Sequence, residues 1–462
     1  MLSATTTTID NVSGTPEPHS PQGFRPAVRL GQEGLGVARG AALVQRTRTR
    51  FSCRVGQLVR RGTRGHYFVY TSSSGAKQIC IGTHQNGPAH VFDDPSKSLH
   101  DIISSDPKRF LGEALLEKWN GETHVPFLFK ILSIEKALPL QVHPDKALAE
   151  ELTKKDPKTF VDPNHKTEIA VCIGEPIDGV SWGEGIAFTS FVGFQPLDDI
   201  SKSVVSVPEL RQAIGDDKVV DAFVETPSKE SLKKLYSTLL RRPQDAVTPL
   251  VRSLVERVSK DPGALEPETV RLVRKAHEQY PGDVGVLSTV FFMNFVKLRR
   301  GEAVYIGADE VHAYLEGDII ECMAISDNVL NVAFVPPAER QTADFVRALT
   351  FTSRDVDHWV LPHAPYAKSK SGSTRAYDPP LEEFVVLGTH LAGTQQETLA
   401  AVDGPTIGIV TEGTMRVAVE GGVLELEQGS IIYVVPSNVV LVELAQADGA
   451  TRGEMWWAAT GV

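Results

Sequence analysis

Cysteine is scarce in this 462-residue sequence, and its spacing excludes the common cysteine-based sites. The four cysteines are far apart, with no CxxC pair and no pairing rhythm: Cys53, Cys80, Cys172 and Cys322. Disulfide frameworks and thiolate metal sites both depend on recurring, closely spaced cysteines. We therefore expect buried thiols rather than disulfides or metal ligands.

Long apolar runs and an excess of positive charge are also absent. No segment approaches the roughly 18 consecutive apolar residues of a membrane-spanning helix, and residues 1–30 lack the apolar core of a secretory signal. The 58 acidic residues outnumber the 47 basic ones, and the net charge of −11 opposes binding to nucleic acid or to anionic membranes. We expect a cytoplasmic monomer without such partners, in which an anionic substrate needs a local positive site.

The pattern along the chain separates a tail from β-rich segments. Residues 1–40, rich in Thr, Ser, Pro and Gly, predict a disordered tail. Short apolar runs between Gly, Pro and Asp predict strands in the rest, and such strands favour sandwiches or barrels over βαβ units. We expect two barrel-like modules, the first from residues 41–200 and 291–375 and the second from residues 376–462.

A helical insert interrupts the first module. Between residues 201 and 290 the apolar spacing changes to that of amphipathic helices, most clearly in "TPLVRSLVERVSK". Thr248 and Pro249 fit the N-cap and first turn of a helix there. The predicted fold class is thus mainly β with an α-helical insert.

The segment "LPLQVHPDKALAEELTKKDPKTFVDPNHKTEIAV" concentrates possible metal ligands. Gln141 and His143 are two residues apart in an apolar run, so a β-strand directs them to one face. His165, Lys166 and Glu168 follow after a polar helical stretch. Because an amide oxygen, an imidazole and a carboxylate can each bind a divalent metal, the segment predicts part of a metal site that needs another ligand from elsewhere.

The segment "GADEVHAYLEGDIIECMAISDN" supplies candidates for that ligand. His312 and Tyr314 share one face of a predicted strand, and Glu321 and Asp327 follow after a predicted Gly-Asp turn. An isolated histidine is usually a packed or surface residue. Its combination with the first segment favours the metal site.

These segments closely resemble the type I mannose-6-phosphate isomerases in their fungal form. The matching text includes "FLFKILSIEKALPLQVHPDK", "DPNHKTEIAV", "VGFQPL", "YPGDVGVLS" and "LRRGEAVYIGADEVHAYLEGDIIECMAISDNV". The resemblance extends from about residue 78 to the end and keeps the family's order of motifs. It implies a catalytic cupin-type β-barrel that carries zinc, a helical domain inserted into it and a C-terminal cupin-like domain.

The resemblance also implies a reaction and a metal. The family interconverts mannose 6-phosphate and fructose 6-phosphate, a step that feeds GDP-mannose synthesis, so the implied partner is a small phosphosugar. A Lewis acid can polarise the sugar carbonyl while a proton moves between C1 and C2. Carried over residue by residue, the ligands of one zinc ion per chain are Gln141, His143, Glu168 and His312. A closed structural zinc site is the alternative, although such sites usually contain thiolates.

Further site residues follow from the same match. The resemblance implies acid, base or orienting roles for Asp327, His165 and Lys166. It implies substrate contacts for Lys130, Tyr314 and His84. Taken singly, the charged residues could be ordinary surface charges, and Asp327 could be a turn residue.

The match breaks near the chemistry. Asn331 stands where the family carries an active-site arginine, while Pro337, Pro139 and Gln78 replace a lysine, a serine and a glutamate. Residues 174–187 resemble an insertion. An arginine grips a phosphate or an oxyanion with a fixed fork of donors, which asparagine does not have. Three interpretations stay open: a working isomerase, a metal-dependent paralogue acting on another substrate in a specialised pathway, and a zinc-binding pseudoenzyme.

Overall fold

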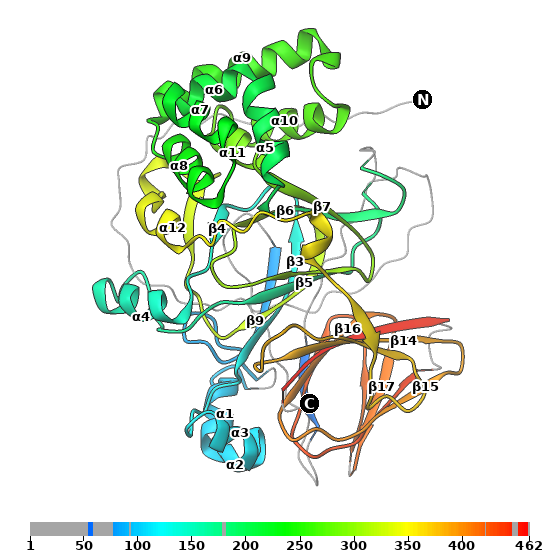
Figure 1. The fold of residues 1–462 in the computed structure, drawn as a ribbon. Coiled ribbons are helices and arrows are strands. Elements are labelled where there is room, and N and C mark those ends of the chain that lie inside the picture. The colour runs from blue at the N-terminus through cyan, green and yellow to red at the C-terminus, as the bar shows by residue number, and fades with distance from the viewer. Residues whose placement is uncertain are drawn as a thin grey trace, which may run out of the picture. The chain divides into compact units, whose positions relative to one another are not determined.

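The computed structural model describes residues 54–58, 77–91, 94–177, 182–420, 422–445 and 451–460 (Figure 1). The predicted tail of residues 1–40, Cys53 and part of the predicted insertion at residues 174–187 lie outside these ranges. The described cysteines are free thiols; Cys172 and Cys322 are buried, as predicted, and Cys80 is only partly buried. No described helix is both long and apolar enough to cross a membrane.

A ten-stranded sheet forms the first β-module. Its strands come from both sides of the helical insert: β2 (Lys77–Ile81), β3 (Phe127–Ile134), β4 (Leu140–Val142), β5 (Glu168–Cys172), β6 (Ile186–Phe194), β7 (Met293–Arg299), β8 (Ala303–Ile306), β9 (His312–Ala324), β10 (Leu330–Ala333) and β11 (Val360–Leu361). Strand β9 pairs with β3, β4, β5 and β6. It therefore joins the segments that come before the insert to those that come after it.

The predicted turn at Gly317 and Asp318 is wrong, because β9 continues through both residues. Gly317 has a φ of +118°, a conformation that L side chains rarely adopt. A Cβ atom at this position would lie 2.4 Å from the carbonyl oxygen of Ala187. The register between β6 and β9 shifts nearby, at Thr189 and Ser190, so glycine here marks a local irregularity within the sheet.

The described helices fall into two groups, those of the insert and those outside it. Five lie outside the insert: α1 (Leu99–Ser105), α2 (Pro107–Leu111), α3 (Glu113–Lys118), α4 (Lys146–Lys155) and α12 (Thr342–Ala348). The insert lies between β6 and β7 and contains α5 (Leu197–Ser206), α6 (Pro208–Ile214), α7 (Asp217–Glu225), α8 (Lys229–Leu240), α9 (Gln244–Lys260), α10 (Pro267–Gln279) and α11 (Gly285–Val290). The helices of the insert gather in one group beside β6 and β7 (Figure 1). Single 3-10 turns complete the described helical structure: η1 (Pro262–Ala264), η2 (Pro337–Glu339) and η3 (Val356–Trp359).

Helix α9 begins earlier than predicted. Pro243 occupies its N-cap position, and Thr248 and Pro249 lie inside the helix. The Gln244 side chain donates from Nε2 to the carbonyl of Gly282 (2.6 Å) and to Thr248 Oγ1 (2.9 Å). These contacts hold the first turn of α9 against the loop before α11, which explains the earlier start.

Two packed sheets form the C-terminal module. The seven-stranded sheet contains β1 (Arg54–Leu58), β12 (His363–Pro365), β13 (Thr374–Tyr377), β14 (Val385–Ala392), β16 (Thr406–Glu412), β19 (Ser430–Val434) and β21 (Arg452–Ala459). The four-stranded sheet contains β15 (Gln396–Leu399), β17 (Met415–Val419), β18 (Gly422–Leu426) and β20 (Val440–Leu444). Buried side chains from both sheets, among them Met455, Trp457, Val417 and Val442, form one hydrophobic cluster. The predicted combination of β-rich modules with a helical insert is confirmed, although no pairing among the described strands closes a barrel.

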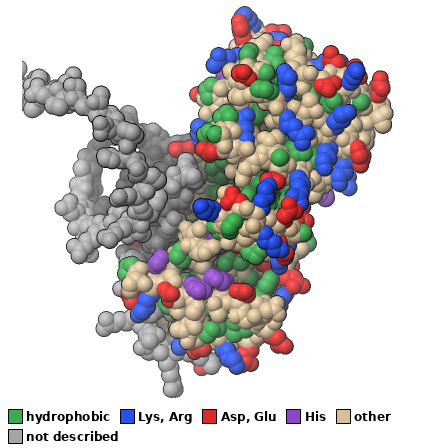
Figure 2. Space-filling model, turned by 90° about the vertical axis from the view of Figure 1, so that its left-hand side faces the viewer, with side chains coloured by type: hydrophobic (Ala, Val, Ile, Leu, Met, Phe, Trp, Pro, Cys, Tyr) green, Lys and Arg blue, Asp and Glu red, His purple; other side chains and the backbone are tan. Residues whose placement is uncertain are grey.

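The two β-modules share a hydrophobic cluster and several polar contacts. Phe127 of β3 meets Phe384 edge to face, with ring centroids 6.5 Å apart. Arg300, in the turn between β7 and β8, contacts Glu454 of β21 at 2.9 Å. On the face shown in Figure 2, basic and acidic side chains of the described residues are interspersed rather than segregated by sign.

Candidate metal centre

Strand pairing brings together the residues that the sequence separates. Strand β4 lies between β9 and β10, and its Gln141 pairs directly with His312 of β9 and with Asn331 of β10. Glu168 begins β5, on the other side of β9, where it pairs with Met323. The central strand therefore carries one predicted ligand and has two others beside it.

Three of the predicted ligands form a compact, fully buried group. One possible ligand atom from each of His143, Glu168 and His312 lies within 4.8 Å of the other two. Among the residues that the structure describes, these three side chains form a group that could hold a metal ion. His312 Nε2 is 3.4 Å from Glu168 Oε1. Gln141 Oε1 is 3.3 Å from His143 Nε2. All four predicted ligands thus meet at one place.

Backbone carbonyls orient both imidazoles. The Nδ1–H of His143 donates to the carbonyl of Lys166 (2.8 Å), and that of His312 donates to the carbonyl of Glu310 (3.0 Å). These bonds assign the proton to Nδ1 and leave each Nε2 with a lone pair. That of His143 accepts from Lys166 Nζ at 3.0 Å. Burial, followed by the charge of Lys166, holds the pKa of His143 well below its usual value, so its imidazole is neutral.

In two places in this cluster, two hydrogen-bond acceptors therefore face each other with no proton between them. The lone pair of His143 Nε2 faces the amide oxygen of Gln141, and that of His312 Nε2 faces a carboxylate oxygen of Glu168. His312 Nε2 is buried and makes no hydrogen bond to any described residue. A cation placed among these atoms would turn the repulsions into attractions. Two imidazole nitrogens, one carboxylate and one amide oxygen fit a zinc ion.

A lysine and a tyrosine hold the Glu168 carboxylate. Tyr314 donates its hydroxyl proton to Oε1 (2.6 Å), and Lys166 Nζ donates to Oε2 (2.9 Å). Burial alone would raise the pKa of Glu168, but the charge of Lys166 keeps it well below its usual value. Burial and then Glu168 raise the pKa of Tyr314 well above its usual value. Glu168 is thus an anion and Tyr314 a protonated donor.

A second buried ion pair lies on the next strand. Lys130 of β3 pairs in register with Glu321 of β9, and Lys130 Nζ is 3.1 Å from Glu321 Oε2. Burial opposes the charge of Lys130, but Glu321 and, less strongly, Cys80 and Glu168 raise its pKa. Lys130 is therefore a buried ammonium whose charge interacts with that of Glu168.

Other predicted residues lie around the cluster rather than in it. Asp327 is exposed; its backbone N–H donates to Asp162 Oδ2 (3.0 Å), and its carboxylate accepts from Asn86 (2.9 Å). Asp162 Oδ2 also contacts His84 Nε2 at 3.3 Å. His165 is not brought into the cluster, because its Nε2 lies 2.7 Å from Glu383 Oε1 of the C-terminal module.

Asn331 occupies a position beside the ligands. Its backbone N–H donates to Gln341 Oε1 (3.1 Å), and its own Oδ1 is buried without a hydrogen bond to any described residue. Arg340 does not replace the missing arginine, since its guanidinium donates to Asp283 Oδ2 (2.7 Å) and to Gln244 Oε1 (2.6 Å). Pro337 begins the η2 turn.

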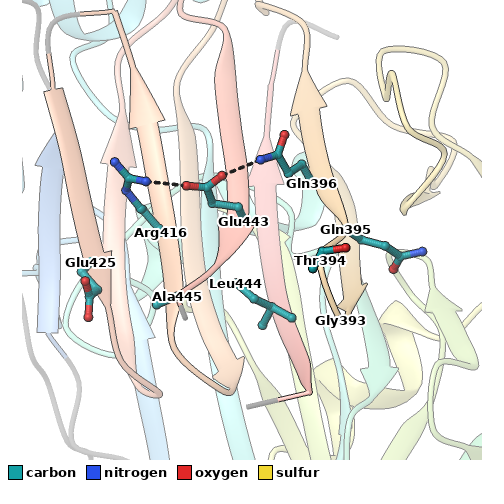
Figure 3. A pocket seen from close by; sticks show the side chains of 9 residues that line it. All are labelled: Gly393, Thr394, Gln395, Gln396, Arg416, Glu425, Glu443, Leu444 and Ala445. Atoms are coloured by element: carbon teal, nitrogen blue, oxygen red, sulfur yellow. Dashed lines mark hydrogen bonds and ion pairs between the residues drawn. The ribbon is translucent and has the colours of Figure 1, made fainter. Parts of the chain in front are cut away.

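Two of the cavities among the described residues have similar volumes. The first, of about 450 Å³, is bounded by residues that include His84, Asp162, Trp119, Lys146 and Glu383. The second, of about 440 Å³, lies on the four-stranded sheet, where Glu443 contacts both Arg416 and Gln396, and it contains none of the predicted site residues (Figure 3). Of these two cavities, the first adjoins the predicted site, through His84.

Sequence reasoning missed Asp162 and Glu383. Both are acidic residues: Asp162 begins the quoted segment "DPNHKTEIAV", and Glu383 lies in "LEEFVVLGTH" at residues 381–390. Their roles depend on partners far away in the chain: His84 for Asp162, and His165 for Glu383. No local pattern of spacing identifies such partners.

Comparison with known proteins agrees with this geometry. Models of type I phosphomannose isomerase match three parts of the chain: the catalytic domain at residues 70–182, the helical insertion domain at residues 208–293 and the C-terminal domain at residues 377–421. The mannose-6-phosphate isomerase of Ogataea parapolymorpha is 34% identical over 79% of this chain and 84% of its own length. The chain belongs to the type I phosphomannose isomerase family.

Other relatives support the same assignment. The mannose-6-phosphate isomerase of Saccharomyces cerevisiae is also 34% identical, over 79% of this chain and 86% of its own length. Among solved structures, the apo form of the Salmonella typhimurium enzyme has a TM-score of 0.65 at 24% identity and covers 83% of this chain and 90% of its own. A mannose 6-phosphate isomerase bound with zinc and yttrium has a TM-score of 0.65 at 22% identity, with coverage of 83% and 91%. These structures confirm the predicted fold class.

Proposed function

We propose that this phosphomannose isomerase family member is a zinc-dependent aldose–ketose isomerase that interconverts mannose 6-phosphate and fructose 6-phosphate in the cytoplasm. In this role it would feed GDP-mannose synthesis. One observation carries the proposal: the unprotonated Nε2 atoms of His143 and His312 face the oxygens of Gln141 and Glu168. The name that the relatives share supplies the substrate.

One zinc ion per chain would be held by Gln141, His143, Glu168 and His312. When bound, it supplies a Lewis acid for the carbonyl chemistry of the sugar. The neighbouring charges suit an anionic substrate. Two ammonium groups, of Lys130 and Lys166, balance two carboxylates, so a divalent ion would leave the site positive.

The protein's own groups then have separate tasks. Lys166 and Tyr314 fix both oxygens of Glu168. Lys166 Nζ also lies 3.0 Å from His143 Nε2 and would give up that contact to a bound metal. Lys130, paired with Glu321, supplies a second buried donor. Asp327 is the exposed carboxylate of the predicted set, and we assign to it the transfer of the proton between C1 and C2. His84, Tyr314 and Lys130 are the proposed substrate contacts.

Asn331 favours a second candidate function, the isomerisation of a different sugar. The residue lies directly beside Gln141, at the position where an arginine would have placed a guanidinium near the ligands. Its amide cannot grip an anion with two parallel donors. A substrate without a phosphate at that point would not need them.

A coupled assay of purified, metal-analysed protein separates the two candidates. The zinc-loaded protein should convert mannose 6-phosphate to fructose 6-phosphate, and removal of the metal with a chelator should abolish the conversion. Turnover of an unphosphorylated aldose in preference to mannose 6-phosphate would favour the second candidate. A folded, zinc-loaded protein that turns over neither sugar would overturn both.

A further inference from the structure

The segment between Asn164 and β5 presents opposite faces to two different parts of the molecule. Lys166 and Glu168 are almost fully buried and point into the metal cluster. His165, between them and the preceding loop, points to the C-terminal module. Thr167 shares its direction, because its hydroxyl contacts His165 Nδ1 at 3.2 Å.

The inward face of this segment sets the geometry of the metal cluster. The carbonyl of Lys166 accepts the proton of His143 Nδ1 and so fixes that imidazole's tautomer and direction. Lys166 Nζ holds a carboxylate oxygen of Glu168, which is itself a predicted ligand. A displacement of the segment would therefore move two ligands at once.

On the outward face, the side chain of His165 contacts one carboxylate of the C-terminal module. Glu383, just before β14, accepts from His165 Nε2 at 2.7 Å and is itself 7% exposed. The backbone N–H of Glu382 donates to the other carboxylate oxygen at 3.1 Å, which fixes the carboxylate. His165 can satisfy both contacts as a neutral imidazole that donates from Nε2 to Glu383 and accepts at Nδ1 from Thr167.

We propose that Glu383 is a positioning residue for the metal site: through His165, the C-terminal module holds the segment that orients His143 and Glu168. The inference rests on the proposed zinc site. It gives the C-terminal module a part in the chemistry, although none of the predicted ligands belongs to that module.

Docking of the two modules does not depend on this contact. Tyr433 of β19 donates its hydroxyl proton to the carbonyl of Phe110 (2.6 Å), and Glu454 contacts Arg300. Apolar residues of both modules share one cluster. Removal of the Glu383 carboxylate should therefore leave the modules together and affect mainly the segment that it holds.

The test compares zinc affinity in three variants, measured by competition with a chromophoric chelator. Glu383→Ala should bind zinc about tenfold more weakly than the wild type, the lower end of the effect seen when an outer partner of a metal ligand is lost. Glu383→Gln keeps an oxygen that can accept from His165 and should stay close to the wild type. Glu382→Ala is the matched control, because its exposed carboxylate pairs with Lys118 and touches neither His165 nor the segment.

Thermal unfolding with and without zinc distinguishes positioning from a general loss of stability. We expect the increase in Tm on zinc addition to shrink in Glu383→Ala and to be restored in Glu383→Gln. Should Glu383→Ala not fold, Glu383→Asp, whose shorter side chain also loses the contact, should show the same weakened affinity. A Glu383→Ala protein with wild-type zinc affinity would overturn this inference alone. A wild type that binds no zinc would overturn the proposed function as well.

Discussion

Two backbone carbonyls decide the chemistry of the candidate site at the scale of single residues. By accepting protons from the Nδ1 atoms of His143 and His312, they direct both Nε2 lone pairs to the same point. Neutral imidazoles can bind a metal without first losing a proton. The anionic ligand, Glu168, is kept charged by Lys166 and hydrogen-bonded by Tyr314.

The substitution Asn331→Arg tests the departure from the family at this scale. If mannose 6-phosphate is the substrate, the new guanidinium should raise kcat/KM by about tenfold or more, since a charged donor is worth a few kcal/mol at a developing anion. Steady-state kinetics of both proteins on mannose 6-phosphate give the answer. If the protein acts on another sugar, the same change should lower that activity.

This experiment has two control substitutions and one outcome that would contradict the prediction. Arg354→Asn and Lys368→Arg change charged groups outside the site and should leave kcat/KM unaltered. Wild-type kinetics equal to those of an arginine-bearing relative, without a gain in Asn331→Arg, would show that the position does not limit turnover.

At the scale of elements, the alternation of side chains along a strand was predicted better than the positions of turns and helix caps. Strand alternation correctly placed His312 with Tyr314, because side chains two apart in a strand share a face whatever surrounds it. Gln141 and His143 also lie together, although β4 ends at Val142, one residue before His143. The predictions at Gly317 and Thr248 were wrong because turns and helix caps depend on the neighbouring elements. The strand passes through Gly317 because β6 packs against it, and α9 starts before Thr248 because Gln244 contacts Gly282.

His165 shows where sequence reasoning reaches its limit. Its place in "DPNHKTEIAV" implied an acid, base or orienting role, which stays a prediction, and its side chain is turned toward Glu383, 218 positions away in the sequence. Because the side chains of Lys166 and Glu168 both point inward, that of His165 faces outward. The partner that it meets there depends on how the two modules pack.

Gly317→Ala tests the account of β9. The substitution adds a methyl group that would lie 2.4 Å from the Ala187 carbonyl oxygen and forces a φ of +118° on alanine, so it should destabilise the protein by roughly 3 kcal/mol or more. Gly121→Ala is the control, because Gly121 also has a positive φ (81°) but an added Cβ would meet nothing within 4 Å. Its cost should be about 1–2 kcal/mol. Denaturant unfolding that gives both variants the same cost would exclude the close approach of β6 and β9.

At the scale of the whole molecule, Glu454 joins the two β-modules through a buried network. Its carboxylate contacts Arg300 of the first module and three neighbours in its own: Thr411, Trp456 and His390. Burial alone would raise the pKa of Glu454, but these neighbours lower it to about 2. The ionised carboxylate therefore stabilises the folded state.

The pH dependence of this contribution can be predicted with its sign. Because the folded pKa lies below the unfolded value of 4.5, the stabilisation is fully present above about pH 4.5 and is lost as the pH falls toward 2. Glu454→Gln should lower the free energy of unfolding at pH 7 by roughly 2–3 kcal/mol and by much less near pH 3. Urea unfolding at both pH values measures this, with the exposed Glu425→Gln as control. An equal loss at the two pH values would mean that the charge of Glu454 contributes nothing.

The most direct test of the central claim is the zinc content of the purified protein and of the His143→Ala/His312→Ala double variant. We expect about one zinc ion per chain in the wild type and none in the double variant. His358→Ala/His363→Ala is the control: it also removes two imidazoles, but exposed ones, and should keep the zinc. Isomerisation of mannose 6-phosphate should disappear together with the metal. Unchanged zinc content in the His143→Ala/His312→Ala protein would contradict the metal centre described here.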